Sequence, residues 1–200
     1  MIKKFTLLLL ALIASSAIKA QTENNPNKTQ ELGLAFSSLD NFGLIYRVGQ
    51  PNSLWRYGTN FINGSSNSDE SPTGKDKSSS FGFSLEVGKE FRRPITEKLA
   101  FRHGLNLGLT FSHYSDPGEA PTESDMKQQS FSPSLGYIIG INFTISPNIY
   151  LGAEIIPGIS YSSTKTTFTD NTGGSNSYTD SGLNYGFSNG SALLSLVYRF

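Results

Sequence analysis

Apolar and polar residues alternate one by one along much of this chain. Between Leu99 and Phe111 every odd position except His103 carries Leu or Phe, whereas the even positions carry Ala, Arg, Gly, Asn and Thr. The same alternation runs through residues 131–143 and 149–161. A period of two residues predicts β-strands with one apolar and one polar face.

Eight segments carry this pattern or a weaker form of it: residues 32–37, 42–48, 54–62, 81–88, 99–112, 130–143, 149–161 and 184–200. Short connections that contain proline, at 49–52, 93–97 and 146–148, alternate with long polar ones at 63–80, 115–127 and 164–182. The first polar connection, 39–41, is unusually short. Eight strands with alternating loop lengths predict an all-β fold, an eight-stranded antiparallel up-and-down transmembrane β-barrel.

The composition of the polar face decides which side points inward. This face is mostly Gly, Ser and Asn, as a narrow interior requires, so we expect the apolar face on the outside. A soluble sandwich or lipocalin-like barrel would tolerate larger polar residues there. Aromatic residues also gather near both strand ends, as they do at the two interfaces of a membrane. One group comprises Tyr46, Trp55, Tyr57, Phe91, Phe101, Phe143, Tyr198 and Phe200, and the other Phe36, Phe42, Phe61, Phe81, Phe111, Phe131 and Tyr161.

The N-terminal residues have the pattern of a secretory signal. Lys3 and Lys4 precede an apolar stretch and then small residues up to Ala20, which predicts a cleaved signal peptide at 1–20 and a single barrel domain at 21–200. The chain has no cysteine and no net charge. These features predict no disulfide or thiolate metal site and no basic surface for nucleic acid.

Charged residues on the polar parity are the most specific candidate chemistry. They are Arg47, Arg56, Glu86, Glu90, Arg102, Glu154 and Arg199. One interpretation is a selectivity ring or a proton path. We favour the other, a structural network of paired charges that fills the lumen, because a buried charge needs a partner and eight strands enclose little free space.

Three positions should disturb the strands. Pro133 and Pro157 lack the N–H that a closed ladder needs, and Pro157 with Gly158 should mark a bulge. In the last strand the apolar parity changes between Tyr185 and Leu194, which predicts another irregularity near Gly190.

The strands, the export signal and the ending Tyr198-Arg199-Phe200 resemble the small outer-membrane barrels of the OmpA and OmpX type, and especially the porin-family barrels of Bacteroidetes. The resemblance implies a cell outer membrane location, a lipid environment and recognition of Tyr198 and Phe200 by the periplasmic barrel-assembly machinery. Members of these families are adhesins, envelope stabilisers or narrow channels.

We therefore expect a non-enzymatic envelope component, without cofactor or metal, that acts through extracellular loops and their ligands. The alternative is a narrow channel or a carrier of small apolar molecules. A lipid A hydrolase is a weaker hypothesis. His113 and Ser115 resemble the His-x-Ser pair of one deacylase family, but Glu119 and Glu123 fall in a loop, so no third group is fixed to orient the base. His103 stands on the lipid-facing parity with no evident partner.

Removing Phe200 tests the assembly signal. We expect the truncated chain to reach the outer membrane at a lower level and to leave unfolded protein in the periplasm, as measured by fractionation and immunoblotting. Normal surface levels of the truncated chain would contradict this assignment.

Overall fold

A computed structural model describes residues 28–38, 41–71, 74–118, 124–170, 172–186 and 192–200. The predicted signal peptide and the centre of the first polar connection, 39–40, lie outside the described residues. The strands are β1 (Thr29–Ser38), β2 (Asn41–Gln50), β3 (Ser53–Ser71), β4 (Gly74–Pro94), β5 (Leu99–Asp116), β6 (Asp125–Ser146), β7 (Ile149–Ile155), β8 (Gly158–Thr169), β9 (Ser175–Gly186) and β10 (Ala192–Arg199).

The strands close into a ring. Each strand from β1 to β6 pairs antiparallel with the next, β7 pairs with β10, and β10 returns to β1. Strand seven of the predicted barrel is β7 followed by β8, and strand eight is β9 followed by β10. The eight-stranded antiparallel barrel predicted from the sequence is therefore confirmed.

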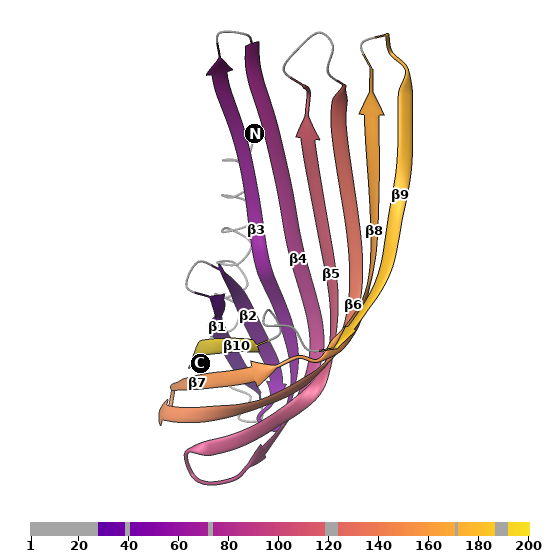
Figure 1. Ribbon diagram of the computed structural model, residues 1–200. Coiled ribbons are helices and arrows are strands. Elements are labelled where there is room, and N and C mark those ends of the chain that lie inside the picture. The colour runs from indigo at the N-terminus through magenta and orange to yellow at the C-terminus, as the bar shows by residue number, and fades with distance from the viewer. Residues whose placement is uncertain (1–27, 39–40, 72–73, 119–123, 171, 187–191) are drawn as a thin grey trace.

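Six strands continue far beyond this ring. β3, β4, β5, β6, β8 and β9 rise together in Figure 1 as one sheet, whereas β1, β2, β7 and β10 stay at the level of the ring. We call this extension the protruding sheet; it comprises residues 61–71, 74–83, 111–116, 125–133, 158–169 and 175–186. The barrel is thus a closed ring that opens at one end into a curved wall.

The first and third predicted polar loops, 63–80 and 164–182, are paired strands over most of their length, whereas β5 ends at Asp116 and β6 begins at Asp125, within the second predicted loop. Residues 63–71 pair with 74–82, and 175–182 pair with 162–169. The period-two pattern fades there because both faces of these strands carry polar residues, so backbone pairing continues without a hydrophobic signal. Short turns were predicted better, since β2 ends at Gln50 before β3 begins at Ser53, and β6 ends at Ser146 before β7 begins at Ile149.

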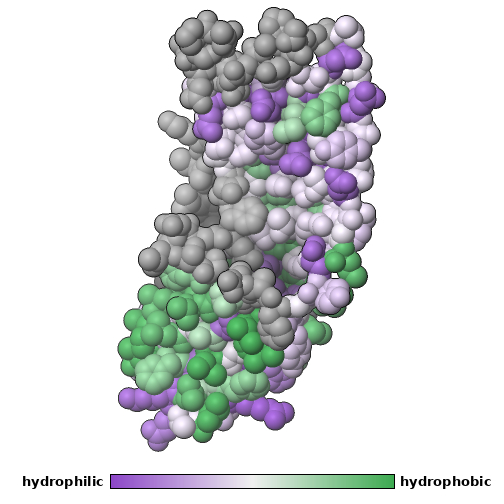
Figure 2. Space-filling model, viewed as in Figure 1, coloured by the Kyte–Doolittle hydropathy of each residue, from purple (hydrophilic) through white to green (hydrophobic). Residues whose placement is uncertain are grey.

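Apolar side chains cover the outside of the ring, as expected. Leu105 and Leu107 on β5 are 56% and 55% exposed, whereas Arg102 on the same strand is fully buried. In Figure 2 the hydrophobic residues gather over the closed ring, and the protruding sheet above it is mostly polar. Exposed aromatic rings flank the aliphatic surface, among them Trp55, Phe91 and Phe143 in the first predicted group, and Phe81, Phe131 and Tyr161 in the second. The side chain of Phe61 is outside the description.

Pro157 interrupts strand seven without a bulge against β6. Ile139 pairs with Ile155, and Gly136 pairs with Gly158, so both strands advance by the same number of residues. Across the break, the Tyr137 amide donates to the Pro157 carbonyl at 2.8 Å. The predicted bulge is therefore absent on this side, because the carbonyl of Pro157 still accepts a ladder hydrogen bond.

The irregularity predicted near Gly190 is confirmed by the register on either side of it, although Gly190 itself lies outside the described residues. Ile155 pairs with Ala192, but Gly158 pairs with Gly186, so strand eight holds three more residues than strand seven over the same interval. An odd excess exchanges the two faces of a strand. This explains why Tyr185 and Leu194 both point outward although their parity differs.

Pro133 is paired with β5 on one side but has no paired residue in β8 on the other. It pairs with Leu109 of β5, while the pairing of β6 with β8 passes from Phe131 to Ser134. The missing N–H therefore costs no hydrogen bond to β5.

The turn between β8 and β9 is held by one carboxylate. Oδ1 of Asp170 accepts hydrogen bonds from the Thr172 hydroxyl at 2.6 Å, the Thr172 amide at 2.9 Å and the Gly174 amide at 2.7 Å. Gly173 adopts a φ of 85°, which favours glycine. The hydroxyl of Thr172 and the amide of Gly174 lower the pKa of Asp170, so this residue is ionised at neutral pH.

Substitution of Leu107 tests the assignment of faces. We expect Leu107→Arg to lower the free energy of unfolding by roughly 2–4 kcal/mol in a lipid bilayer, because the charge must enter hydrocarbon. Gly108→Ala is the control for the opposite face, where a new Cβ would crowd Ser134 Oγ. Both are measured by denaturant titration in vesicles. Full tolerance of arginine at Leu107 would show that this surface does not face lipid.

Candidate functional site

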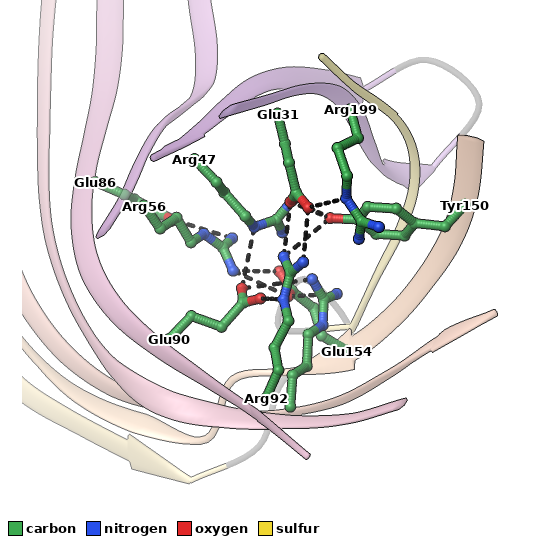
Figure 3. A network of polar contacts seen from close by, with 10 residues as sticks. Glu31, Arg47, Arg56, Glu86, Glu90, Arg92, Tyr150, Glu154 and Arg199 are labelled. Carbon is green, nitrogen blue, oxygen red and sulfur yellow. Dashed lines mark hydrogen bonds and ion pairs between the residues drawn. The ribbon is translucent and has the colours of Figure 1, made fainter. Parts of the chain in front are cut away.

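The lumen of the closed ring holds a network of arginine and glutamate side chains. Alternation along each strand turns these residues inward, and the registers of neighbouring strands bring them to one level; for example, Arg47 of β2 pairs directly with Arg56 of β3. Figure 3 shows these side chains converging on the barrel axis from strands on all sides of the ring. Glu31, Arg47, Arg56, Glu90 and Arg102 are completely buried.

Glu31 of β1 is the centre of the first cluster. Its two carboxylate oxygens each accept a hydrogen bond at 2.7 Å from the terminal nitrogens of Arg92 on β4, a bidentate pair. Oε2 also accepts a hydrogen bond from the Tyr150 hydroxyl at 2.6 Å, and Arg199 Nε donates to Oε1 at 3.1 Å. Glu31 therefore links the first, fourth, seventh and last strands of the ring.

Glu90 of β4 connects this cluster to the next. Oε1 accepts a hydrogen bond from Arg92 Nε at 2.7 Å, and Oε2 accepts one from Arg47 Nε at 3.0 Å. Arg102 Nη1 lies 3.6 Å from Oε2. Glu90 therefore offsets the charges of three arginines, of which Arg47 and Arg102 are completely buried.

Glu154 of β7 holds the third cluster. It forms ion pairs of 2.7 Å with Arg56 Nη1 and with Arg102 Nη2. Arg56 Nη2 lies 3.5 Å from Glu86, the most exposed carboxylate of the network. Four glutamates, Glu31, Glu86, Glu90 and Glu154, thus face four deeply placed arginines, Arg47, Arg56, Arg92 and Arg102.

Glycines on the inward face provide the volume that these side chains occupy. A Cβ at Gly140 would lie 2.7 Å from Arg102 Nε, and a Cβ at Gly152 would lie 3.0 Å from Arg102 Nη2. Gly140 is the direct neighbour of Arg102 across the β5–β6 ladder. The small residues that indicate a narrow interior therefore leave the space in which guanidinium groups lie.

The structure places the predicted lumen residues as follows. Arg47, Arg56, Glu86, Glu90, Arg102 and Glu154 join one network, while Arg199 lies at its rim with 38% of its side chain exposed. Glu31 and Arg92 were missed. Glu31 precedes the expected first strand by one residue, and Arg92 stands in an Arg-Arg-Pro sequence that resembles a turn, although β4 continues to Pro94.

The two histidines lie on the outer wall. His113 pairs with Phe81 and Gln129, and Ser115 pairs with Ser79 and Lys127, so His113 and Ser115 share the outward face as expected. Glu119 and Glu123 are outside the described residues. His103 was expected to have no partner, but its Nδ1 lies 3.1 Å from the Tyr137 hydroxyl. Within the part of the chain that is described, no group of three metal-binding side chains occurs.

This arrangement fills the ring from within. Aliphatic side chains such as Ile45, Leu54 and Val197 are buried beside the charges. Burying a charge costs the free energy of its hydration, and ion pairs and hydrogen bonds offset that cost only while the partner groups stay in place. The network therefore joins strands that do not touch each other and makes the packing of the lumen depend on their register.

Comparison with protein families gives one match that covers most of the chain. The model described as "Outer membrane protein beta-barrel domain" matches residues 5–194. No curated protein matches the sequence. In the described part of the chain, no helix has the length and hydropathy needed to cross a membrane.

The solved structures that match this chain share little sequence with it. A major outer membrane protein of Thermus thermophilus is 15% identical, with a TM-score of 0.49 and coverage of 86% of this chain and 98% of that one. Ail, the attachment invasion locus protein of Yersinia pestis, is 16% identical, with a TM-score of 0.38 and coverage of 87% and 99%. CarO of Acinetobacter baumannii is 9% identical, with a TM-score of 0.30 and coverage of 87% and 96%.

Removal of Glu154 tests the structural role of the network. We expect Glu154→Ala to destabilise the folded barrel by roughly 3–5 kcal/mol, because Arg56 and Arg102 would remain buried without their nearest carboxylate. Glu97→Ala, in the exposed turn after β4, is the matched control and should leave stability nearly unchanged. Denaturant titration measures stability, and planar bilayers measure open-channel current. Steady current that changes in Glu154→Ala, at unchanged stability, would identify a channel instead.

Proposed function

Because this chain belongs to the outer membrane protein beta-barrel domain family, we propose that it is a non-enzymatic component of the outer membrane that contacts partners through its protruding sheet. Barrels of this kind place their short turns in the periplasm and their longer connections outside. By that rule the protruding sheet stands at the cell surface. The observation that carries the proposal is the contrast between a lumen filled by ion pairs and a wide polar sheet beyond it.

The face of the protruding sheet that continues the lumen is lined with hydrogen-bonding side chains. One row crosses five strands and comprises Ser80, Tyr114, Gln128, Thr166 and Tyr178. The next row comprises Ser112, Ser130, Thr164 and Asp180. Such rows of hydroxyl, amide and carboxylate groups favour a polar partner with many hydrogen-bonding groups.

Aromatic rings lie at the far end of the same face. Phe168 and Tyr178 stack with ring centroids 6.1 Å apart, and Tyr178 is half exposed. An aromatic ring beside Asp180 and Thr164 offers both an apolar surface and directed hydrogen bonds, the combination common in polar recognition sites. This end of the β8–β9 hairpin is therefore the part of the sheet that we assign to recognition.

A carrier of small apolar molecules is the second candidate. A groove of about 640 Å³ lies on the closed ring near the end of β7. Its lining includes Phe101, Ile139, Ile155 and Leu194. These four side chains belong to the outward face of the ring, so the groove opens toward lipid. It supports contact with acyl chains more directly than transport.

Substitutions on the two faces of β9 test the recognition surface. We expect Tyr178→Ala/Asp180→Ala, on the lumen-side face, to reduce adherence of expressing bacteria to cultured epithelial cells and immobilised glycans several-fold. Ser177→Ala/Thr179→Ala changes the opposite face of the same strand and is the matched control. Surface levels are equalised by antibody labelling. Equal adherence of both variants and the unchanged protein would contradict the proposal.

A further inference from the structure

A compact group of cationic and polar side chains lies on the outward face of the protruding sheet. Gln129 of β6 pairs with His113 of β5 on one side and with Lys165 of β8 on the other, which places the three in one row. Lys127 lies in the next row, between Ser115 and Thr167. Diagonal neighbours on one face of a sheet are roughly 7–8 Å apart, so Lys127 is close to both His113 and Lys165. We call His113, Lys127, Gln129 and Lys165 the cationic patch.

The patch directly borders the surface that faces lipid. The row next to it on the barrel side contains Phe111 and Phe131, which pair with each other. Phe131 and Tyr161 are half exposed on the same outward face. Aromatic residues of this kind mark the level of the membrane interface. The cationic patch thus begins where the hydrocarbon region ends.

The two faces of the protruding sheet differ in charge. Among the described side chains, Lys77, Lys127 and Lys165 lie on the outward parity, whereas Asp116 and Asp180 lie on the lumen-side parity. Asp125, one row farther from the barrel than Lys127, also lies on the outward face and is the acidic member among the described side chains there. The lysines are therefore concentrated on the side that adjoins the membrane.

We propose that the cationic patch binds the phosphate groups of the glycolipid that forms the outer leaflet of the outer membrane. Two ammonium groups supply charge, and the Gln129 amide and the His113 ring supply directed hydrogen bonds to phosphate oxygens. The acyl chains of the same lipid would lie along Phe111, Phe131 and Tyr161.

This proposal is independent of the recognition surface on the other face. A protein partner or a soluble glycan would meet the lumen-side face first, because the outward face adjoins lipid. Lipid contact of this kind would hold the protruding sheet at a fixed angle to the membrane. It also gives a role to His113 that requires no catalytic partner.

Lipid binding by the folded full-length protein tests the proposal. The protein in detergent is titrated with bisphosphorylated lipid A and with enzymatically dephosphorylated lipid A, and bound lipid is measured by native mass spectrometry. We expect the phosphorylated form to bind more tightly, and Lys127→Gln/Lys165→Gln to lose about tenfold or more of that preference. Arg93→Gln/Lys98→Gln removes the same charge from the exposed end of β4 and the turn that follows it, and should keep the preference.

Several results would overturn the proposal. They are equal binding of both lipid A forms by the unchanged protein, an undiminished preference in the double lysine variant, and an equal loss in the control variant. Complete displacement by millimolar inorganic phosphate would also overturn it, because the site would then bind free phosphate. The heat-dependent gel shift of each folded variant verifies that the barrel is intact.

Discussion

Backbone hydrogen bonding is the constraint on which the rest of this structure depends. A strand edge in a bilayer would leave N–H and C=O groups without partners, at a cost of several kcal/mol each, so a sheet can cross only if it closes. The pairing of β10 with β1 provides that closure. Above the ring, water satisfies free edges, so β3 and β9 can end the sheet without joining. The protruding sheet and the closed ring are thus one continuous sheet, with water around the first and lipid around the second.

Closure also determines the chemistry of the interior. Eight strands enclose a space that side chains fill, and the sequence fills it with guanidinium and carboxylate groups around Glu31, Glu90 and Glu154. A hydrophobic filling would avoid the cost of dehydrating these charges. Ion pairs add specificity, because each pair forms only when the strands that carry its two residues are in one register. The network thus reinforces the same pairing that the lipid demands of the backbone.

The sequence was informative wherever two different environments lie on either side of a strand. Lipid outside and polar residues inside produce the alternation from Leu99 to Phe111. The number of strands, the face of each strand that points outward and the parity change near Gly190 could therefore be predicted. It was uninformative where water lies on both sides, and the strands of the protruding sheet were mistaken for loops. Contacts such as Glu31 with Arg92 join residues far apart in sequence and depend on register, which alternation does not determine. Arg92 was further obscured by the turn-like residues that follow it.

The unequal lengths of strands seven and eight beyond Ile155 divide strand eight into two parts that differ in phase. Below this point the even-numbered residues of strand eight face lipid; above it the odd-numbered ones face outward. The excess of residues falls between Gly186 and Ala192, so β9 leaves the frame of β10, whereas β8 keeps the register of β7 against β6. Strand eight can therefore gain or lose residues in this interval while the ladder between β6 and strand seven stays in register.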